Sequence, residues 1–254
     1  MIAIDAGNTL IACAVFDGEE IGQVHRISTQ VCLQSGSFLG NLPMLPDLAI
    51  EDVVLSSVRK QVKDLIISEI KAKTGSSPFV VDVTTDMGII NLYETKQTLG
   101  VDRVICAAAG FHLYSRGVYP LVIIDMGTAT TIDYLTEKGE YLGGIIAPGL
   151  MSAYDGLLAR APELPRLDVR PGGPLIGKTT DQCILSGVIH GHSALIERVV
   201  DKMVQDRGSD AGVLLTGGFS AVLRDLLPHR YVHDQDLILK GLRTIYTFHR
   251  ENKC

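Results

Sequence analysis

Short apolar runs separated by polar turns fill the first half of the chain. The pattern predicts three strands in succession, at Met1–Asp5, Ile11–Asp17 and Glu20–Arg26. Asp17-Gly18-Glu19 is typical of a hairpin turn between the second and the third. The pattern then predicts strand, helix, strand and helix in alternation, at Val53–Ser57, Gln61–Lys73, Phe79–Val83 and Val104–Tyr114.

The second half repeats this order. Three strands are predicted again, at Leu121–Asp125, Thr131–Thr136 and Tyr141–Ala147. Two helices are expected after them, at Met151–Arg160 and Asp181–Arg207. A strand at Gly212–Thr216 and two more helices, at Ser220–Leu227 and Asp234–Phe248, complete the chain. Two segments carry the weakest pattern, Gln30–Ile50 and the Pro- and Gly-rich Ala161–Gly177, which we expect to be a mobile loop.

A repeated order of three strands followed by alternating strands and helices is the layout of two ribonuclease-H-like lobes. We therefore expect an α/β protein with duplicated lobes, each a mixed sheet flanked by helices, at residues 1–117 and 118–254. Sequence identity between the halves is slight, so this prediction depends on the order of elements and on two matching strand ends described below.

Composition narrows the class of protein. Of the 254 residues, 46% are hydrophobic, which is ample for a core, and the net charge of −6 argues against a nucleic-acid partner. No run of 18 apolar residues is present, so no membrane span is expected. The five cysteines are scattered, and the N-terminus enters a predicted strand directly, so no signal peptide is expected. These features predict a cytoplasmic protein with free thiols.

Two look-alike segments lie at the ends of predicted buried strands, Asp5-Ala6-Gly7-Asn8-Thr9 and Asp125-Met126-Gly127-Thr128-Ala129-Thr130-Thr131. In each, a carboxylate is followed by a glycine, which permits a tight turn, and then by hydroxyl or amide side chains. Peptide N–H groups and hydroxyls at such a turn suit phosphate oxygens, and the Asp can hold a cation. One such corner alone is also consistent with an ordinary capped turn. Two of them indicate a nucleoside triphosphate held between the lobes.

A third segment, Tyr93–Arg103, brings Asp102 and Arg103 together after Gly100 at a helix start. Asp102 can accept a proton from an alcohol that attacks a phosphate, and Arg103 suits an anionic group. A simple helix cap with a solvated arginine is the alternative, which the segment alone does not exclude.

In order and spacing, the chain resembles the type III pantothenate kinases, members of the acetate and sugar kinase, heat-shock ATPase and actin superfamily. The resemblance runs nearly end to end and is carried by Asp5–Thr9, Ser56-Ser57-Val58, Leu99–Arg103, Asp125–Thr131, Gly143-Gly144, Pro148-Gly149, Leu164-Pro165, Ile176–Thr180, Gly187, Thr216-Gly217-Gly218 and Leu239–Leu242.

The resemblance implies an actin-like ATPase fold and ATP-dependent phosphorylation of pantothenate to 4'-phosphopantothenate, the first step of coenzyme A biosynthesis. Asp102 is implied as the general base and Asp125 as the ligand of a monovalent cation (K⁺ or NH₄⁺), with Mg²⁺ bound alongside ATP near Asp5. The implied ATP contacts are Asp5, Ala6, Gly7, Asn8, Thr9, Leu10, Ile11, Ala12 and Thr128. The implied pantothenate contacts are Tyr93, Gly100, Val101, Asp102, Arg103 and Thr180. The resemblance also implies a homodimer with the substrate pocket near the subunit interface.

Three positions depart from the family pattern: Leu10 where a polar residue is frequent, Lys96 where proline is common, and Thr179 in place of asparagine. Two other interpretations stay open. The first is a weakly active or inactive family member that acts as a regulatory accessory protein, and the second is another small-molecule kinase, or a phosphatase, of the superfamily. The apolar residues of Ile184–Val200 fit a subunit interface or a core equally well, and His190 and His192 are expected to be structural or surface residues.

Overall fold

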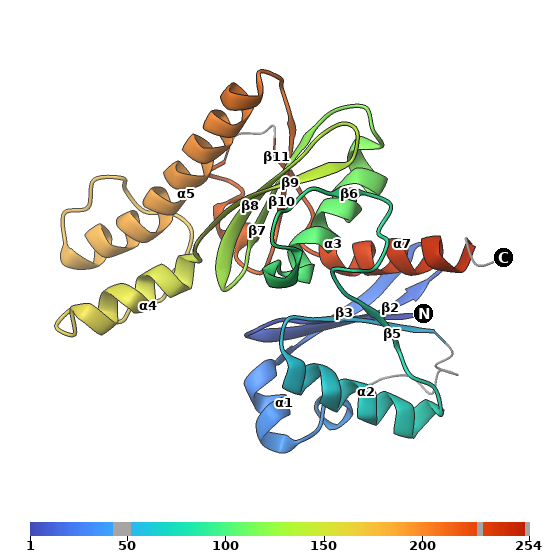
Figure 1. Cartoon of the computed structure of the whole chain (residues 1–254). Helices are drawn as coiled ribbons and strands as arrows, with labels where there is room; N and C mark the ends of the chain where they lie inside the picture. Colours follow the sequence, from blue (N-terminus) through green and yellow to red (C-terminus); the bar gives the residue numbers. More distant parts are fainter. Residues whose placement is uncertain (43–51, 228–230, 252–254) are drawn as a thin grey trace. The chain divides into compact units, whose positions relative to one another are not determined.

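The computed structural model describes residues 1–42, 52–227 and 231–251 of the chain (Figure 1). Contacts between Cα atoms divide it into two compact units. The first unit contains Met1–Tyr114 together with Leu237–Cys254, and the second contains Ser115–Asp236. The lobes predicted at 1–117 and 118–254 differ from these units in two places. The last helix belongs here to the first unit, and residues 115–117 belong to the second.

The sheet of the first unit has the order β3-β2-β1-β4-β5. Its strands are β1 (Ile2–Ala6), β2 (Leu10–Asp17), β3 (Glu20–Ser28), β4 (Val53–Ser57) and β5 (Phe79–Val81). β1 pairs antiparallel with β2 and parallel with β4. The same unit contains two 3₁₀ helices, η1 (Leu39–Asn41) and η2 (Lys96–Thr98). It also contains the short strand β6 (Ile90–Asn91), which is not a strand of this five-stranded sheet.

Helices cover both faces of this sheet. On one face lie α1 (Thr29–Ser35) and α2 (Lys60–Thr74), and on the other lie α3 (Val101–Gly110) and α7 (Leu237–Glu251) (Figure 1). Because side chains alternate along a strand, Ile2 and Ile4 both point into the core shared with Ile66 of α2. α3 continues into the π-helical turn η3 (Phe111–Ser115).

The second unit repeats the topology of the first. Its strands are β7 (Leu121–Met126), β8 (Ala129–Leu135), β9 (Glu140–Pro148), β10 (Gly212–Thr216) and β11 (Tyr231–His233). The sequence β9-β8-β7-β10-β11 in its sheet matches β3-β2-β1-β4-β5, with antiparallel and parallel pairs in the same places. Its helices are α4 (Leu150–Arg160), α5 (Thr180–Arg207) and α6 (Ser220–Leu223).

The repeated order of elements predicted from the sequence is therefore confirmed, with five local corrections. The helix predicted at Val104–Tyr114 begins at Val101, so Asp102 and Arg103 lie within it, and it ends at Gly110 before the π-helical turn. The segment Gln30–Ile50, predicted to be weakly organised, begins with helix α1, whose start is capped by Ser28, although 43–50 lie outside the described residues. The helix predicted at Ser220–Leu227 ends at Leu223 and continues as turns. The last helix begins at Leu237, because Asp234 still bonds to Leu215 of β10 through its backbone. The short strands β6 and β11 were not predicted.

The structure also bears on two predictions about side chains. Ile189, Ile196 and Val200 of α5 lie in the core of the second unit, as the core interpretation of this helix required. Cys13, Cys32, Cys106 and Cys183 are free thiols, whereas Cys254 lies outside the described residues. Among the helices described, none is long and apolar enough to cross a membrane.

Candidate active site

The first strand-end corner places a carboxylate beside a buried hydroxyl. Asp5 is half-buried near the end of β1, and its Cα partner on the parallel strand β4 is Ser56. Ser56 is fully buried and donates a hydrogen bond of 2.6 Å to Asp5 Oδ1. Burial raises the pKa of Asp5 to about 7; the Ser56 hydrogen bond opposes the rise and the charge of Asp102 adds to it. The two carboxylates of the first unit therefore interact electrostatically.

The turn that follows β1 is fixed through its carbonyl groups. Thr29, at the start of α1, donates from Oγ1 to the Gly7 carbonyl (3.0 Å) and from its peptide N–H to the Thr9 carbonyl (2.9 Å). Arg59, directly before α2, donates from Nη1 to the Asn8 carbonyl (3.3 Å). Engaging these three oxygens keeps them from an approaching anion, which suits a turn that presents donors to phosphate.

The residues predicted to contact ATP are not equivalent in this corner. Asn8 and Thr9 are exposed in the turn, and so is Leu10, which has no polar side-chain atom to offer a phosphate. Ala6 and Ile11 are fully buried, so their side chains serve the core. Sequence reasoning assigned no role to Thr29 or Arg59, because their contacts join segments far apart in the chain.

The second group of predicted residues meets at the start of α3. Gly100 is the residue before the helix, and Asp102 lies in its first turn, where the helix dipole favours a negative charge. Arg103 donates from its peptide N–H to Asp102 Oδ1 (2.9 Å). A Cβ atom on Gly100 would lie 2.4 Å from the same oxygen, so the position of the Asp102 carboxylate depends on a glycine at 100. Val101 is buried and its side chain packs in the core.

Tyr93 and Arg103 come together in the same unit. The guanidinium carbon of Arg103 lies 5.7 Å from the centroid of the Tyr93 ring, within the range of a cation–π contact. Arg103 is only 6% exposed. Asn91 Oδ1 accepts a 3.0 Å hydrogen bond from the Tyr93 peptide N–H and fixes the backbone there. The structure thus brings together Tyr93, Gly100, Asp102 and Arg103.

The second corner has the same construction as the first. Asp125 is half-buried near the end of β7, opposite the buried hydroxyl of Thr216 on β10. Gly217, with φ +93°, approaches so closely that a Cβ there would lie 2.4 Å from Asp125 Oδ1. Thr128 is exposed, and its carbonyl accepts from Gly149 N–H (3.1 Å) and from the hydroxyl of Ser152 (2.6 Å).

The oxygen atoms of Asp5 and Asp125 show whether the two strand-end corners suit the implied cations. In the described residues, no group of three or more His, Cys, Asp or Glu side chains is arranged to hold a metal ion. Mg²⁺ bound with a nucleotide needs only one or two carboxylates, because phosphates and waters complete its shell. Asp5 supplies one such carboxylate near the end of β1 and fits that requirement. Asp125 offers carboxylate oxygens that can coordinate K⁺ or accept hydrogen bonds from NH₄⁺.

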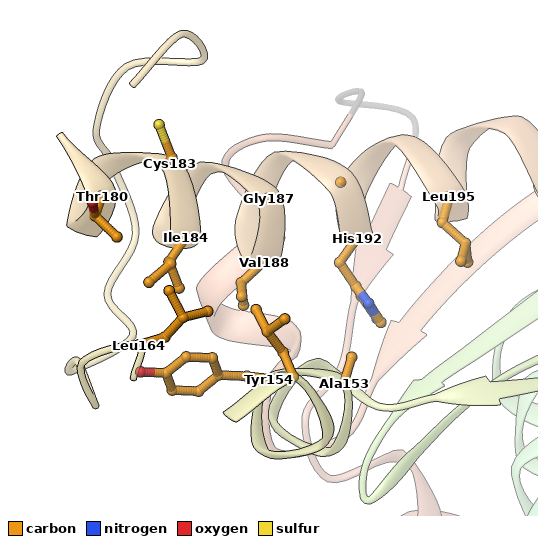
Figure 2. Close-up of a pocket in the computed structure, with 12 residues that line it drawn as sticks. Ala153, Tyr154, Leu164, Thr180, Cys183, Ile184, Gly187, Val188, His192 and Leu195 are labelled. Carbon is orange, nitrogen blue, oxygen red and sulfur yellow. The ribbon is translucent and has the colours of Figure 1, made fainter. Parts of the chain in front are cut away.

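Thr180 stands apart from these groups, at the first turn of α5 in the second unit. Together with apolar residues of α4 and α5 it lines a cavity of about 540 Å³ (Figure 2). Ile184, Val188, Tyr154 and Leu164 point toward one another across this cavity, whereas Cys183 points away. The departure at Thr179 has a structural role, because Thr179 caps α5 by accepting from the Gln182 peptide N–H (3.2 Å).

The two histidines of α5 have structural roles, as expected. His192 is buried at the same cavity and shares a 2.9 Å hydrogen bond with Thr130 Oγ1. Burial lowers the pKa of His192, so the neutral ring is favoured. The side chain of His190 reaches instead toward the Gly173 carbonyl. Because the two side chains have different partners, they do not form a ligand pair.

Comparison with known proteins identifies relatives over the whole chain. A family model described as type III pantothenate kinase matches residues 1–202. Two enzymes of that name, from Syntrophotalea carbinolica and Moorella thermoacetica, are each 34% identical over 252 residues, covering 97% of this chain and 98% of theirs. The enzyme of Geobacter sulfurreducens is 31% identical and covers 99% of this chain and 100% of its own.

Solved structures show the same fold. A conserved protein of Campylobacter jejuni, assigned to the Baf family of transcriptional activators, has a TM-score of 0.64 at 17% identity and covers 99% of this chain and 100% of its own. MreB 5 of Spiroplasma citri bound to AMPPNP has a TM-score of 0.52 at 11% identity and covers 99% and 97%. The fold is thus that of the actin-like ATPases, as the resemblance implied.

Proposed function

This chain belongs to the type III pantothenate kinase family, a family of ATP-dependent kinases, and from that premise we propose that it phosphorylates pantothenate. The γ-phosphoryl group of ATP is transferred to the primary hydroxyl of pantothenate, giving 4'-phosphopantothenate and ADP as the first step of coenzyme A biosynthesis. The observation that carries the proposal is the family match along the chain, together with Asp102 held beside Arg103 at the start of α3. A cytoplasmic location stays a prediction.

Asp102 is the proposed general base. As the hydroxyl oxygen forms its bond to the γ-phosphorus, the bond from that phosphorus to the bridging oxygen breaks, and Asp102 takes the hydroxyl proton. The alcohol pKa is far above 7, so the reaction depends chiefly on positioning and on neutralising charge. The Arg103 peptide N–H orients the Asp102 carboxylate, and the lack of a side chain at Gly100 leaves room for it.

Pantothenate is proposed to contact Tyr93, Gly100, Val101, Asp102, Arg103 and Thr180. The Arg103 guanidinium, stacked near Tyr93, suits the carboxylate of pantothenate, since arginine pairs with carboxylates through two parallel hydrogen bonds. Val101 contributes through its backbone, because its side chain is buried.

The turn from Asp5 to Ala12 is the proposed phosphate loop, and Thr128 an additional ATP contact. Exposed Asn8 and Thr9 are the side chains best placed to meet phosphate oxygens. Mg²⁺ bound with ATP near Asp5 would neutralise charge on the phosphates. Asp125 is proposed to hold the monovalent cation, K⁺ or NH₄⁺.

We also propose that the protein is a homodimer. Leu157 and Leu195 line the cavity of the second unit and are 42% and 37% exposed, and the nearby loop leaves Leu175 and Ile176 exposed as well. A cluster of large exposed apolar side chains is typical of a surface that a partner covers. A second copy of the chain is the partner we propose.

An assay of ADP release with different acceptors tests the proposed function. Turnover is expected with pantothenate and not with a panel of sugars or with acetate, and it should require K⁺ or NH₄⁺. Turnover on a sugar or on acetate alone would assign another kinase activity. ATP binding without turnover on any acceptor would favour the regulatory interpretation.

A further inference from the structure

The guanidinium of Arg59 lies on the turn that is proposed to bind the phosphates. Its Nη1 donates to the carbonyl of Asn8, in the middle of the turn, at 3.3 Å. In the described part of the chain, no carboxylate pairs with Arg59. Its positive charge beside the turn therefore has no counter-charge within hydrogen-bonding distance.

The backbone of Arg59 is tied to the end of β1. The hydroxyl of Ser57 accepts from the Arg59 peptide N–H (3.1 Å) and lies 3.1 Å from the carbonyl of Ala6. The peptide N–H of Val58 donates to the same Ala6 carbonyl (3.3 Å). Because both its backbone and its tip are bonded to the β1 end and the turn after it, Arg59 holds a fixed position relative to that turn.

The chemistry of this position suits a phosphate. A guanidinium carries five N–H donors in a planar fork, and the Asn8 carbonyl engages one of its nitrogens, so others remain for an anion. Leu10, exposed in the same turn, offers no donor. A cationic side chain would add to Mg²⁺ in balancing the negative charges of a triphosphate that approaches the carboxylate of Asp5.

We propose that Arg59 binds the terminal phosphates of the nucleotide through its guanidinium, an inference that rests on the proposed function of the turn. Its bond to the Asn8 carbonyl orients the fork, and the remaining N–H groups donate to phosphate oxygens. Arg59 is then a nucleotide-binding residue that supplies the polar contact which Leu10 lacks.

Calorimetric titration of the full-length protein with MgATP, MgADP and AMP tests this assignment. Arg59→Gln should weaken ATP binding by about 10-fold or more, because a hydrogen bond to a charged group contributes about 1.5–3 kcal/mol, and should change AMP affinity by less than about twofold. Arg59→Lys should recover part of the loss, since lysine binds phosphate as a point charge. Thermal unfolding verifies that each variant is folded.

Lys60→Gln is the matched control, because it removes an exposed positive charge at the adjacent position. It should leave ATP affinity within about twofold of the wild type. The assignment is overturned if Arg59→Gln binds ATP like the wild type, if it weakens AMP as much as ATP, or if Lys60→Gln has an equal effect. Titration does not require turnover, so a wild-type protein that binds ATP but does not phosphorylate pantothenate would contradict the proposed reaction and leave the Arg59 result interpretable.

Discussion

At the scale of single residues, Asp5 shows the conflict between stability and function. Its burial opposes ionisation, and the hydrogen bond from Ser56 offsets part of this effect. The neighbouring Asp102 charge acts in the same direction as burial. A site that binds a cation and phosphates benefits from such a carboxylate, although the protein without ligands is less stable for it.

The raised pKa of Asp5 predicts how stability depends on pH. The folded protein holds the Asp5 proton up to about pH 7, whereas the unfolded chain releases it near the ordinary value of 3.8. The contribution of this group to stability is therefore greatest below pH 4, falls as the pH rises, and levels off above 7. As the pH rises from 5 to 8, the free energy of unfolding of Asp5→Asn should increase by at least about 1 kcal/mol relative to that of the wild type.

Denaturant unfolding of the ligand-free protein at pH 5, 6, 7 and 8 measures this difference. Asp155→Asn, at an exposed carboxylate of α4, serves as the control and should follow the wild type at every pH. Parallel curves for Asp5→Asn and the wild type would show that the Asp5 pKa is not raised on folding.

Gly100 is a second residue whose role follows from geometry. Gly100→Ala places a Cβ within 2.4 Å of Asp102 Oδ1, so the carboxylate must move. We expect kcat to fall by about 10²-fold, the loss typical of a misplaced catalytic group, while the protein stays folded. Gly156→Ala, in a helix where a Cβ meets nothing within 4 Å, is the matched control and should keep full activity. Equal kcat values for both variants would show that the position of the Asp102 carboxylate does not affect the catalytic rate.

At the scale of elements, the starts of two helices shape the proposed phosphate turn. α1 contributes Thr29 and α2 follows Arg59, and together they bond to the carbonyls of Gly7, Asn8 and Thr9. In the second unit, the start of α4 does the same for Thr128 through Gly149 and Ser152. In both corners a helix start thus orients a strand-end turn.

Thr29→Val tests the first of these contacts. Valine keeps the shape of threonine but leaves the Gly7 carbonyl without its hydroxyl donor, which should cost about 1–3 kcal/mol of stability. The Michaelis constant for ATP should rise several-fold, and that for pantothenate should change little. Thr29→Ser retains the hydroxyl and should behave like the wild type; equal Michaelis constants for ATP in both variants would contradict a role of Thr29 in the turn.

Elements with a clear period were predictable, and contacts between distant segments were not. β10 was predicted with its observed bounds because it is a short apolar run closed by a Gly pair. α1 was missed because its seven residues include few apolar positions at helical spacing. Asp5 and Asp125 were predicted as site residues because each follows an apolar strand, and Asp102 because it lies at the start of a helix. The roles of Ser56, Thr29 and Arg59 depend on which strands and helices are neighbours, although a hydroxyl at the end of β4 was an available signal for Ser56.

At the scale of the whole molecule, the repeated topology explains why two corners of similar construction occur in one chain. Each corner ends the strand that pairs antiparallel on one side and parallel on the other, β1 in the first unit and β7 in the second. The polar partner on the parallel strand is Ser56 in one and Thr216 in the other. A duplicated frame thus provides two strand-end carboxylates, which we propose serve different ligands.

The proposed homodimer makes a prediction at this scale. Sedimentation velocity should give about twice the chain mass of 27.4 kDa. Leu195→Glu, at the rim of the cavity, should shift the protein toward monomer because it places a charge in an apolar interface. Val232→Glu, at another exposed apolar position of the second unit, should remain dimeric. A wild-type monomer, or no difference between the two variants, would refute this interface.

The central claim is tested most directly by the rate of 4'-phosphopantothenate formation from ATP and pantothenate, compared between the wild type and Asp102→Asn. The claim predicts turnover by the wild type, a kcat reduced by about 10²–10⁴-fold in Asp102→Asn, and unchanged ATP binding and fold in the variant. A wild-type protein that forms no 4'-phosphopantothenate, or an Asp102→Asn variant with near wild-type kcat, would contradict it.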